Sequence, residues 1–413
     1  MSPAPPCRFC RTPLVHTVVD LGAQPLSNAY LTRAQLAAGT ERAYPLHARV
    51  CHACFLVQVD DPVAADAIFD ADYAYFSSYS PSWVAHAKRY AEAMSTRLGL
   101  TPQSLVMEIA SNDGYLLQHF VAAGIPVLGI EPAANTAEAA RARGVTTEVM
   151  FFNAASARAL AGRGVEADLI AANNVLAHVP DIGDFVAGFR QVLRPQGVVT
   201  FEFPHLLKLI ELVQFDTIYH EHYSYLSLLA VERVLAAQGL RAFDVERLPT
   251  HGGSLRLFCA HLGAGHEETQ SLRDLRAEEA AAGLGRIEGY QGFAERAAKL
   301  RDGFLAYLRQ AKAAGRKVAA YGAAAKGNTF LNYAGVTADD IVCVFDANPV
   351  KQGRFLPGSH LPILSPDQVA EVRPDDLLIL PWNLKDEIIG QMGMIRAWGG
   401  RFVTASPDVT VIA

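Results

Sequence analysis

The chain repeats one local pattern, a short apolar strand followed by a tight turn and a helix, in two separate blocks. The first block places such strands at 104–110, 127–132, 167–174 and 197–203. The second block places them at 316–321, 341–348 and 376–383. Strands that alternate with helices build parallel sheets, whose ligands bind at the carboxyl ends of the strands. The sequence therefore predicts an α/β protein with two doubly wound units.

Size and charge narrow the possible functions. The chain has 413 residues, of which 51% are hydrophobic, so it can form two or three domains with sizeable cores. Its net charge of −6 argues against an unspecific binder of nucleic-acid phosphates, which would be basic. No apolar run approaches bilayer-spanning length, and the residues after Met1 lack signal-peptide character. We therefore expect a soluble cytoplasmic protein.

Two cysteine pairs lie near the N-terminus, and two residues separate the members of each pair: Cys7 and Cys10, then Cys51 and Cys54. Two such turns present four thiolates to one tetrahedral ion, so the spacing predicts a structural zinc site. Disulfides are the alternative, which a cytoplasmic location disfavours. A redox role is disfavoured because neither pair opens a helix after a strand. Four thiolates leave no open coordination position, so this zinc should stabilise the fold and not catalyse.

These features divide the chain into three expected domains. Residues 1–70 form a zinc-binding module that is too small to carry much core of its own. Residues 71–245 form the first doubly wound unit, and residues 246–413 form the second, after a stretch of helical periodicity at 267–314. No oligomer seam stands out, so a monomer is expected.

The turn after the first strand favours a methyl donor over a dinucleotide. A dinucleotide fold requires a G-x-G-x-x-G turn, whereas residues 110–114 contain only Gly114. Acidic groups at Glu108 and Asp113 suit a cationic ligand such as the aminoacyl part of S-adenosylmethionine. The expected cofactor-binding residues are Glu108, Ala110, Asn112, Asp113, Gly114, Glu131, Pro132, Asn173 and Asn174.

Glu131 ends the next strand, where an acid can accept hydrogen bonds from ribose hydroxyls. The order of these residues is typical of a class I methyltransferase. Each residue also has a simpler interpretation: Glu108 as a capped carboxylate at a strand end, and Glu131 as a turn acid before Pro132.

The first turn of the second unit, residues 323–328, is small and carries a lysine, so it suits an anion. Backbone N–H groups at a helix start and a nearby ammonium bind phosphate well. Asp346 and Asn348 end the neighbouring strand and can bind a base or a sugar hydroxyl. The expected substrate-binding residues are Lys326, Asn328, Asp346, Asn348 and Lys351. The alternative is a Rossmann-like domain that only packs.

The segment 216–223, Asp-Thr-Ile-Tyr-His-Glu-His-Tyr, lies between the two units and concentrates ionisable side chains. Tyr, Glu and His are the groups that remove a proton and stabilise the anion that remains. The alternative is a polar turn with ordinary hydrogen bonds. Methyl transfer to carbon requires a base beside a C–H that a carbonyl acidifies, with donors for the enolate oxygen. A nucleotide-linked ketosugar has both that C–H and a phosphate handle.

In their order along the chain, these motifs resemble the zinc-containing, S-adenosylmethionine-dependent sugar C-methyltransferases of deoxysugar biosynthesis, the family of the tetronitrose 3′-C-methyltransferase. The resemblance covers nearly the whole chain. It rests on the two cysteine pairs, Gln-Pro-Leu-Ser-Asn at 24–28, Glu-Ile-Ala-Ser-Asn-Asp-Gly at 108–114, and the segments 173–181, 219–223 and 321–327.

The resemblance implies an N-terminal zinc domain, a central methyl-donor domain and a C-terminal Rossmann-like domain that binds a nucleotide-diphosphate sugar. The implied acceptor is a dTDP-linked 4-keto-deoxysugar, methylated at C3; methylation at C5 and a GDP carrier stay open. His222 resembles the family's general base, with Glu221 in support, and Tyr219 steadies the enolate oxygen. The remaining residues implied to line the site are His178 and an aromatic from 73–79, Tyr73 or Tyr79.

Three other functional classes compete. An RNA methyltransferase with a zinc ribbon should be basic, and this chain is acidic. A non-catalytic sensor of nucleotide sugars needs no base, which disfavours it given the segment 216–223. A nicotinamide oxidoreductase is disfavoured by the single glycine in the first turn.

Overall fold

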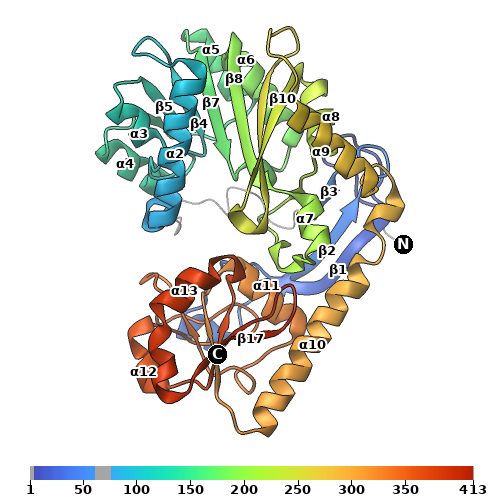
Figure 1. The fold of residues 1–413 in the computed structure, drawn as a ribbon, viewed down its shortest axis with the longest axis vertical. Coiled ribbons are helices and arrows are strands. Elements are labelled where there is room, and N and C mark those ends of the chain that lie inside the picture. Colours follow the sequence, from blue (N-terminus) through green and yellow to red (C-terminus); the bar gives the residue numbers. More distant parts are fainter. Residues whose placement is uncertain (1–3, 61–75, 413) are drawn as a thin grey trace.

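The computed structural model describes residues 4–60 and 76–412, and it contains three sheets arranged in two halves (Figure 1). One half holds a seven-stranded sheet and the other a six-stranded sheet. The strands of the N-terminal segment and the long helix α10 (Phe293–Ala313) lie along one side of the molecule. Within the described ranges, no helix is both long and apolar enough to cross a bilayer. The predicted α/β architecture is confirmed.

The N-terminal sheet is antiparallel and takes one strand from the middle of the chain. Its order is β1 (His16–Pro25), β2 (Ala43–Val50), β3 (Val57–Gln58) and β9 (Ser224–Tyr225). Helix α1 (Arg33–Ala38) connects β1 to β2. Because β9 follows the segment 216–223 directly, the N-terminal module fixes the position at which that segment ends.

The central sheet has seven strands in the order β10-β11-β8-β7-β4-β5-β6, of which the five from β8 to β6 are parallel. Its strands are β4 (Val106–Ile109), β5 (Val127–Ile130), β6 (Thr147–Glu148), β7 (Ala167–Asn173), β8 (Leu193–Pro204), β10 (Leu240–Leu248) and β11 (Ser254–His261). Its helices are α2 (Pro81–Leu98), α3 (Leu117–Ala122), α4 (Ala134–Ala142), α5 (Ala154–Gly162), α6 (Ile182–Val192), α8 (Leu228–Ala237) and α9 (Gln270–Ala281).

The antiparallel hairpin β10–β11 differs from the expectation. The sequence pattern ends this unit at residue 245, whereas the hairpin extends the sheet to His261. An antiparallel strand joined by a short turn needs no crossover helix, so the alternation that located the other strands stops before it. The helical stretch expected at 267–314 is also interrupted, because the glycine-rich residues 282–292 separate α9 from α10.

The C-terminal sheet has six strands in the order β14-β13-β12-β15-β16-β17, and all neighbours are parallel except β16 and β17. Its strands are β12 (Val318–Tyr321), β13 (Val344–Phe345), β14 (Ile363–Leu364), β15 (Asp376–Ile379), β16 (Arg401–Thr404) and β17 (Thr410–Ile412). Its helices, besides α10, are α11 (Ala325–Ala334), α12 (Val369–Val372) and α13 (Lys385–Gln391).

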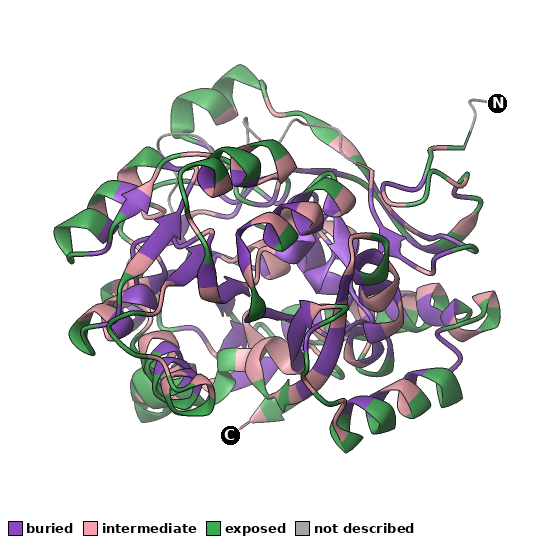
Figure 2. Cartoon of the chain, turned by 90° about the horizontal axis from the view of Figure 1, so that it is seen from above, coloured by how far each residue is buried: buried purple, intermediate pink, exposed green. Residues whose placement is uncertain are grey.

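The N-terminal strands and the C-terminal unit share one hydrophobic core. Val19 and Leu46 from the N-terminal sheet belong to the same buried cluster as Phe304 of α10 and Leu378 of β15. Helix α7 (Leu206–Glu211) also packs into this cluster. A short segment thus completes its core by packing against a larger unit, as its size requires. Figure 2 shows buried residues filling the strands while the outer faces of the helices are exposed.

A buried carboxylate joins the central sheet to two of its helices. Glu279 of α9 accepts hydrogen bonds from the backbone amides of Leu228 (2.7 Å) and Leu229 (2.9 Å), which open α8. It also bonds His205, at the end of β8, at 2.7 Å. A carboxylate is stabilising at a helix N-terminus because it satisfies free amides there.

We predict that Glu279→Ala lowers the free energy of unfolding by about 3 kcal/mol, because it leaves buried donors without an acceptor. The neighbouring variant Glu278→Ala is the matched control. Glu278 pairs with Arg247 and Lys208 near the surface, and such a pair contributes about 1 kcal/mol at most. Urea unfolding of the three proteins measures the difference, and equal losses in both variants would contradict this role for Glu279.

Candidate active site

The four predicted zinc ligands meet in space. The Sγ atoms of Cys7, Cys10, Cys51 and Cys54 all lie within 4.8 Å of one another, with Cys7 3.6 Å from Cys54 and Cys10 3.4 Å from Cys51. A tetrahedral ion with Zn–S bonds near 2.3 Å places its sulfur atoms about 3.8 Å apart. The Gln58 amide donates a hydrogen bond to Cys7 Sγ at 3.2 Å. This cluster fits a zinc ion whose four positions are filled by sulfur.

Arg8, inside the first cysteine turn, connects the zinc cluster to the catalytic region. Its guanidinium donates to the carbonyl oxygens of Pro180 at 2.7 Å and Val59 at 2.6 Å. It also lies 5.1 Å from the centre of the Tyr223 ring. Through Arg8, the cluster therefore supports both the loop that carries His178 and the end of the segment 216–223.

Tyr219 and His222 form a hydrogen-bonded pair. Tyr219 Oη lies 2.6 Å from His222 Nε2, and His222 Nδ1 lies 3.1 Å from the carbonyl oxygen of Thr217. A carbonyl oxygen only accepts, so Nδ1 carries the proton and Nε2 holds a lone pair that accepts from the tyrosine hydroxyl. His178 packs edge-on against His222, with ring centres 4.6 Å apart. The pair thus presents a proton acceptor and a hydroxyl donor together.

Burial keeps both imidazoles neutral. It lowers the pKa of His222 well below its usual range, and the neighbouring His178 lowers it further. Burial likewise lowers the pKa of His178 to about 4. A neutral imidazole is the form that can accept a proton, so the lone pair of His222 Nε2 is unprotonated near neutral pH.

Glu221 and His220, between these two residues, point elsewhere. Glu221 is buried and accepts a hydrogen bond from Asn28 Nδ2 at 2.7 Å. Burial raises the pKa of Glu221, and the Asn28 bond opposes that rise. His220 bonds the carbonyl oxygen of Pro45 at 3.2 Å and packs edge-on against Tyr44. His220 therefore anchors the segment to the N-terminal sheet.

The carboxyl ends of β4 and β7 supply the predicted methyl-donor site. Glu108 is buried, its Oε2 has no partner among the described residues, and its carboxyl interacts with the Tyr115 hydroxyl. Burial raises its pKa, and the charges of Glu131 and Asp113 add to the effect. Nearby carboxylates with unsatisfied oxygens fit a cation, and S-adenosylmethionine is cationic. Three non-glycine residues at this edge have positive φ, as functional turns often do: Ala110, Asn112 and Asn174.

Two acids of this site are already engaged by the protein. Glu131 accepts hydrogen bonds from the backbone amides of Asn112 (2.8 Å) and Ala133 (2.9 Å). Asp113 pairs with Arg143 at 3.0 Å and accepts from the Ser78 hydroxyl. The carboxylates are thus rigidly oriented, and the Oδ1 atom of Asp113 has no partner among the described residues.

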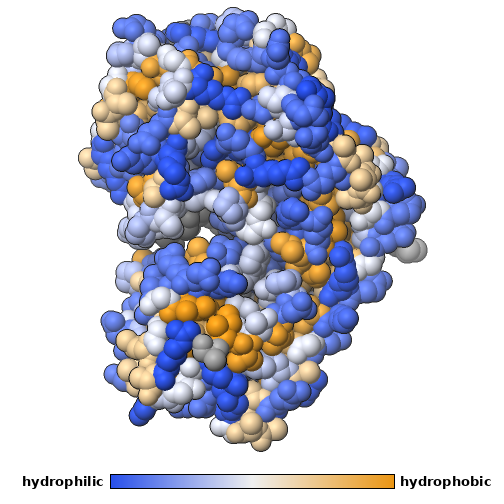
Figure 3. Space-filling model, in the orientation of Figure 1, coloured by the Kyte–Doolittle hydropathy of each residue, from blue (hydrophilic) through white to orange (hydrophobic). Residues whose placement is uncertain are grey.

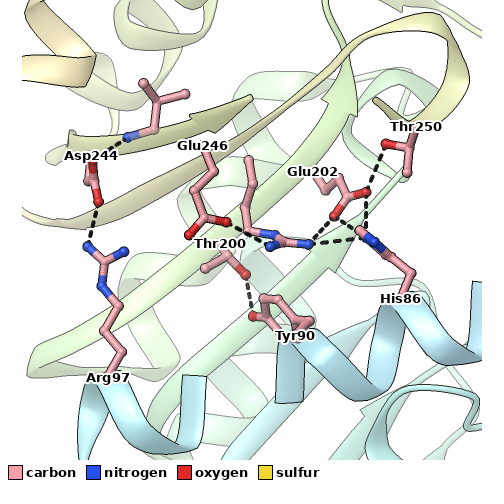
Figure 4. A network of polar contacts seen from close by, with 10 residues as sticks. His86, Tyr90, Arg97, Thr200, Glu202, Asp244, Glu246 and Thr250 are labelled. Atoms are coloured by element: carbon pink, nitrogen blue, oxygen red, sulfur yellow. Dashed lines mark hydrogen bonds and ion pairs between the residues drawn. The ribbon is translucent and has the colours of Figure 1, made fainter. Parts of the chain in front are cut away.

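A third buried carboxylate, Glu202, lies at the end of β8 (Figure 4). It pairs with Arg256 at 2.7 Å and with His86 of α2 at 3.0 Å, and Thr250 bonds it at 3.4 Å. A buried charge is stable only when it is paired and hydrogen-bonded, as here. The network fixes the turn that holds His251, a non-glycine residue with φ 53°.

Lys326, which belongs to the C-terminal half, places a cation near the segment 216–223. Its ammonium lies 4.8 Å from the centre of the Trp382 ring and 3.2 Å from Asn383 Oδ1. Trp382 donates to Asp216 at 2.6 Å across the two halves, between which Figure 3 shows the surface hollowed. Burial lowers the pKa of Lys326, and burial raises that of Asp216 to about 6. The charge of Lys326 also lowers the pKa of His222, so the cation lies within electrostatic reach of this imidazole.

The other predicted substrate residues surround the turn at Ala323. Asp346 accepts from the amide of Ala323 at 2.8 Å and from that of Asn348 at 2.8 Å. Lys351 donates to the carbonyl of Ala323 at 2.8 Å and lies 3.4 Å from Asp346. Helix α11 begins at Ala325 without a side-chain cap, which leaves its first amides available to an anion. Asn328 instead is fully buried and donates to the carbonyl of Ser27.

Of the two aromatic candidates, the structure describes only Tyr79. Tyr73 lies outside the described residues. Tyr79 is 66% exposed and stacks on Phe76 with ring centres 5.3 Å apart. The structure therefore does not bring Tyr79 to His222.

Several residues of the site escaped the sequence reasoning. Asn28 lies within the motif at 24–28, but nothing in that motif indicates that its amide contacts Glu221. Asp216 was part of the catalytic segment without an assigned role. No sequence pattern indicated a role for Trp382 or His251, apart from the Gly252–Gly253 pair beside His251. Glycine is needed there because an added Cβ at Gly252 would lie 2.3 Å from Trp382.

Three family models match consecutive parts of the chain. A "Putative zinc binding domain" matches residues 7–69, a "Methyltransferase domain" matches 83–245, and a "C-methyltransferase C-terminal domain" matches 249–407. The central seven-stranded sheet is accordingly that of a class I methyltransferase.

Individual relatives are consistent with these matches. The C-methyltransferase NovU of Streptomyces niveus is 36% identical over 411 residues, which cover 100% of this chain and 97% of NovU. A ubiquinone biosynthesis O-methyltransferase of Bartonella bacilliformis is 27% identical over 95 residues, which cover 23% of this chain and 38% of that enzyme. Magnesium protoporphyrin IX methyltransferase of Synechocystis PCC 6803, solved with bound S-adenosylmethionine, matches 48% of this chain and 88% of its own, with 16% identity and a TM-score of 0.33.

We predict that Cys51→Ala loses the bound zinc, because three thiolates no longer close the tetrahedral site. Cys343→Ala, which removes a buried thiol outside the cluster, should keep about one ion per chain. Zinc content measured by atomic emission distinguishes the two. Chelation of the wild-type protein should also lower its thermal midpoint, since a structural zinc contributes to folding. An unchanged midpoint in the metal-free protein would contradict a structural role.

Proposed function

The chain belongs to the family of zinc-containing, S-adenosylmethionine-dependent C-methyltransferases, and on this premise we propose that it methylates C3 of a dTDP-linked 4-keto-deoxysugar. The observation that carries the proposal is the Tyr219–His222 pair, because transfer to carbon needs a base and an enolate donor at one point. A methyltransferase acting on oxygen has no need of an enolate donor.

His222 is proposed to act as the general base. When the ketosugar binds, the Tyr219 hydroxyl turns from His222 Nε2 to the substrate carbonyl oxygen and leaves the lone pair of Nε2 free. Nε2 then takes the C3 proton, and the electron pair of the broken C–H bond moves into the enolate. The proton rests on His222 until it leaves to solvent, and His178 lines the wall beside it.

S-adenosylmethionine, when bound, supplies the electrophilic methyl group. This methyl group would pass to the enolate carbon, the electrons of the carbon–sulfur bond would stay on sulfur, and the carbonyl would re-form. The residues proposed to hold the methyl donor are Glu108, Ala110, Asn112, Asp113, Gly114, Glu131, Pro132, Asn173 and Asn174. The aromatic wall residue is proposed to be Tyr73, since Tyr79 is exposed.

The nucleotide-diphosphate sugar is proposed to bind at the turn before α11. Lys326 and the uncapped amides of α11 suit its negative charge, and Asp346, Asn348 and Lys351 surround the same turn. Asn328 supports this turn from behind through its bond to Ser27. We propose a monomer of three domains, at about 1–70, 71–245 and 246–413, except that the hairpin β10–β11 extends the central sheet to His261.

We predict that His222→Asn lowers methyl transfer by about 10²–10⁴-fold, the range for loss of a general base, while S-adenosylmethionine binding stays intact. His220→Gln is the matched control, because His220 faces Pro45 and should keep most of its turnover. Product formation is measured by mass, and cofactor binding by calorimetry. Near-normal turnover in His222→Asn would move the base to another residue, with Tyr219 the next candidate.

Incubation with labelled methyl donor and a panel of nucleotide-linked 4-ketosugars tests the substrate. We expect methylation at C3 of a dTDP-sugar, read by mass and by NMR; product from GDP-sugars or at C5 would revise the acceptor. In deuterium oxide without methyl donor, the wild-type enzyme should exchange the C3 hydrogen, because proton removal precedes transfer. Absence of exchange would count against the enolate, and label in RNA would revive an RNA-modifying role.

A further inference from the structure

Two residues of the N-terminal module lie between the catalytic segment and the substrate turn. Asn28 Nδ2 is 2.7 Å from Glu221 Oε1, and Asn28 Oδ1 is 3.1 Å from the hydroxyl of Tyr30. The same hydroxyl is 2.6 Å from the carbonyl oxygen of Ala323. Lys351 donates to that carbonyl as well, at 2.8 Å. A continuous line of polar contacts therefore joins Glu221 to the turn that precedes α11.

The number of available protons limits which hydrogen bonds this line of contacts can form at one time. Tyr30 has one O–H and two acceptors in reach, and the shorter contact is to Ala323. While Asn28 donates to an ionised Glu221, its own oxygen competes with Ala323 for that one proton. Among the described residues, Asn28 is the side chain seen to hold the carboxylate of Glu221.

The amide of Asn28 has a second arrangement in which no two acceptors compete for the Tyr30 proton. If Glu221 is protonated, its O–H donates to the Asn28 oxygen, and the turned NH₂ group donates to the Tyr30 oxygen. Tyr30 then gives its proton to Ala323 without competition. The two orientations of an amide have almost the same shape, so the turn needs no rearrangement of the packing.

We propose that Asn28 is a positioning residue that orients Glu221 and sets its ionisation, and that Tyr30 anchors Asn28 to the substrate turn at Ala323. That Glu221 supports His222 is implied by the family resemblance and rests on the proposed function, whereas the contact between Asn28 and Glu221 does not. Through Asn28 and Tyr30, the N-terminal module is part of the reaction site as well as a zinc-stabilised support for it.

Other charged or titratable groups lie around Glu221. The variants used in the test leave these groups unchanged. The His178 imidazole bonds the backbone of Glu221. Behind Tyr30 lie Asp346 and Lys351, and the flanking residues of the segment are His220 and His222. Burial raises the pKa of Glu221 and the Asn28 bond lowers it. Loss of that bond must therefore raise the pKa of Glu221 further.

The test replaces Asn28 with Leu and Tyr30 with Phe. If ionised Glu221 is required, the acid limb of the pH profile of kcat/KM moves to higher pH in Asn28→Leu, with activity recovering toward wild type above it. Tyr30→Phe should move it in the same direction by less, because the donor to Glu221 stays. Asn332→Leu is the matched control, since this half-buried amide bonds only the carbonyl of Pro357. A uniform loss at every pH, without displacement of the limb, would overturn the proposal.

A second readout does not depend on turnover. Infrared difference titration of the full-length zinc protein should show a protonated carboxyl band that disappears in Glu221→Gln and titrates at higher pH in Asn28→Leu. If no ketosugar is methylated, yet the band moves as described, the proposed function fails while the role of Asn28 stands. If ketosugars are methylated but the band does not move in Asn28→Leu, the role of Asn28 fails alone.

Discussion

The pairing of β3 with β9 is the contact on which the position of the segment 216–223 depends. Gln58 is the centre of this contact: its backbone pairs with Ser224, its amide nitrogen donates to Cys7 Sγ, and its amide oxygen accepts from the backbone of Arg8. One residue thus bonds the metal cluster and the strand that follows Tyr223. Backbone pairing constrains a chain more tightly than side-chain packing does, because each bond has a defined direction. The segment 216–223 is therefore held in position before any ligand arrives.

Burial away from water affects the pKa values of the site residues as strongly as any single hydrogen bond does. Burial is the first cause of the depressed pKa of His178, His222 and His251, and of the raised pKa of Glu221. Neutral imidazoles and carboxyl groups with a raised pKa suit the proposed reaction, which moves one proton and one methyl group in a water-poor space. Burial also lowers the pKa of Lys326, and the charge of Asp216 opposes that shift.

Much of the fold could be predicted from local pattern, and less of the site. The four cysteines, the parallel strands and the turns after β4 and β12 follow from spacing and periodicity, which act over a few residues. The hairpin β10–β11 could not be predicted in this way, because antiparallel strands lack the helix that marks a crossover. Asn28 and Trp382 reach the segment 216–223, and Tyr30 reaches Ala323, only through tertiary packing, over separations of more than 150 residues. Sequence pattern carries no information on such contacts.

The shared core of the N-terminal strands and the C-terminal sheet has a topological consequence. The N-terminal strands and the C-terminal sheet build one unit, so the methyltransferase sheet is in effect an insertion within it. Deleting the first sixty residues would strip an apolar face from the distant α10 and β15, and an isolated C-terminal fragment would lack part of its own interior. Evolution of this architecture by simple end-to-end fusion of three independent folding units is therefore disfavoured.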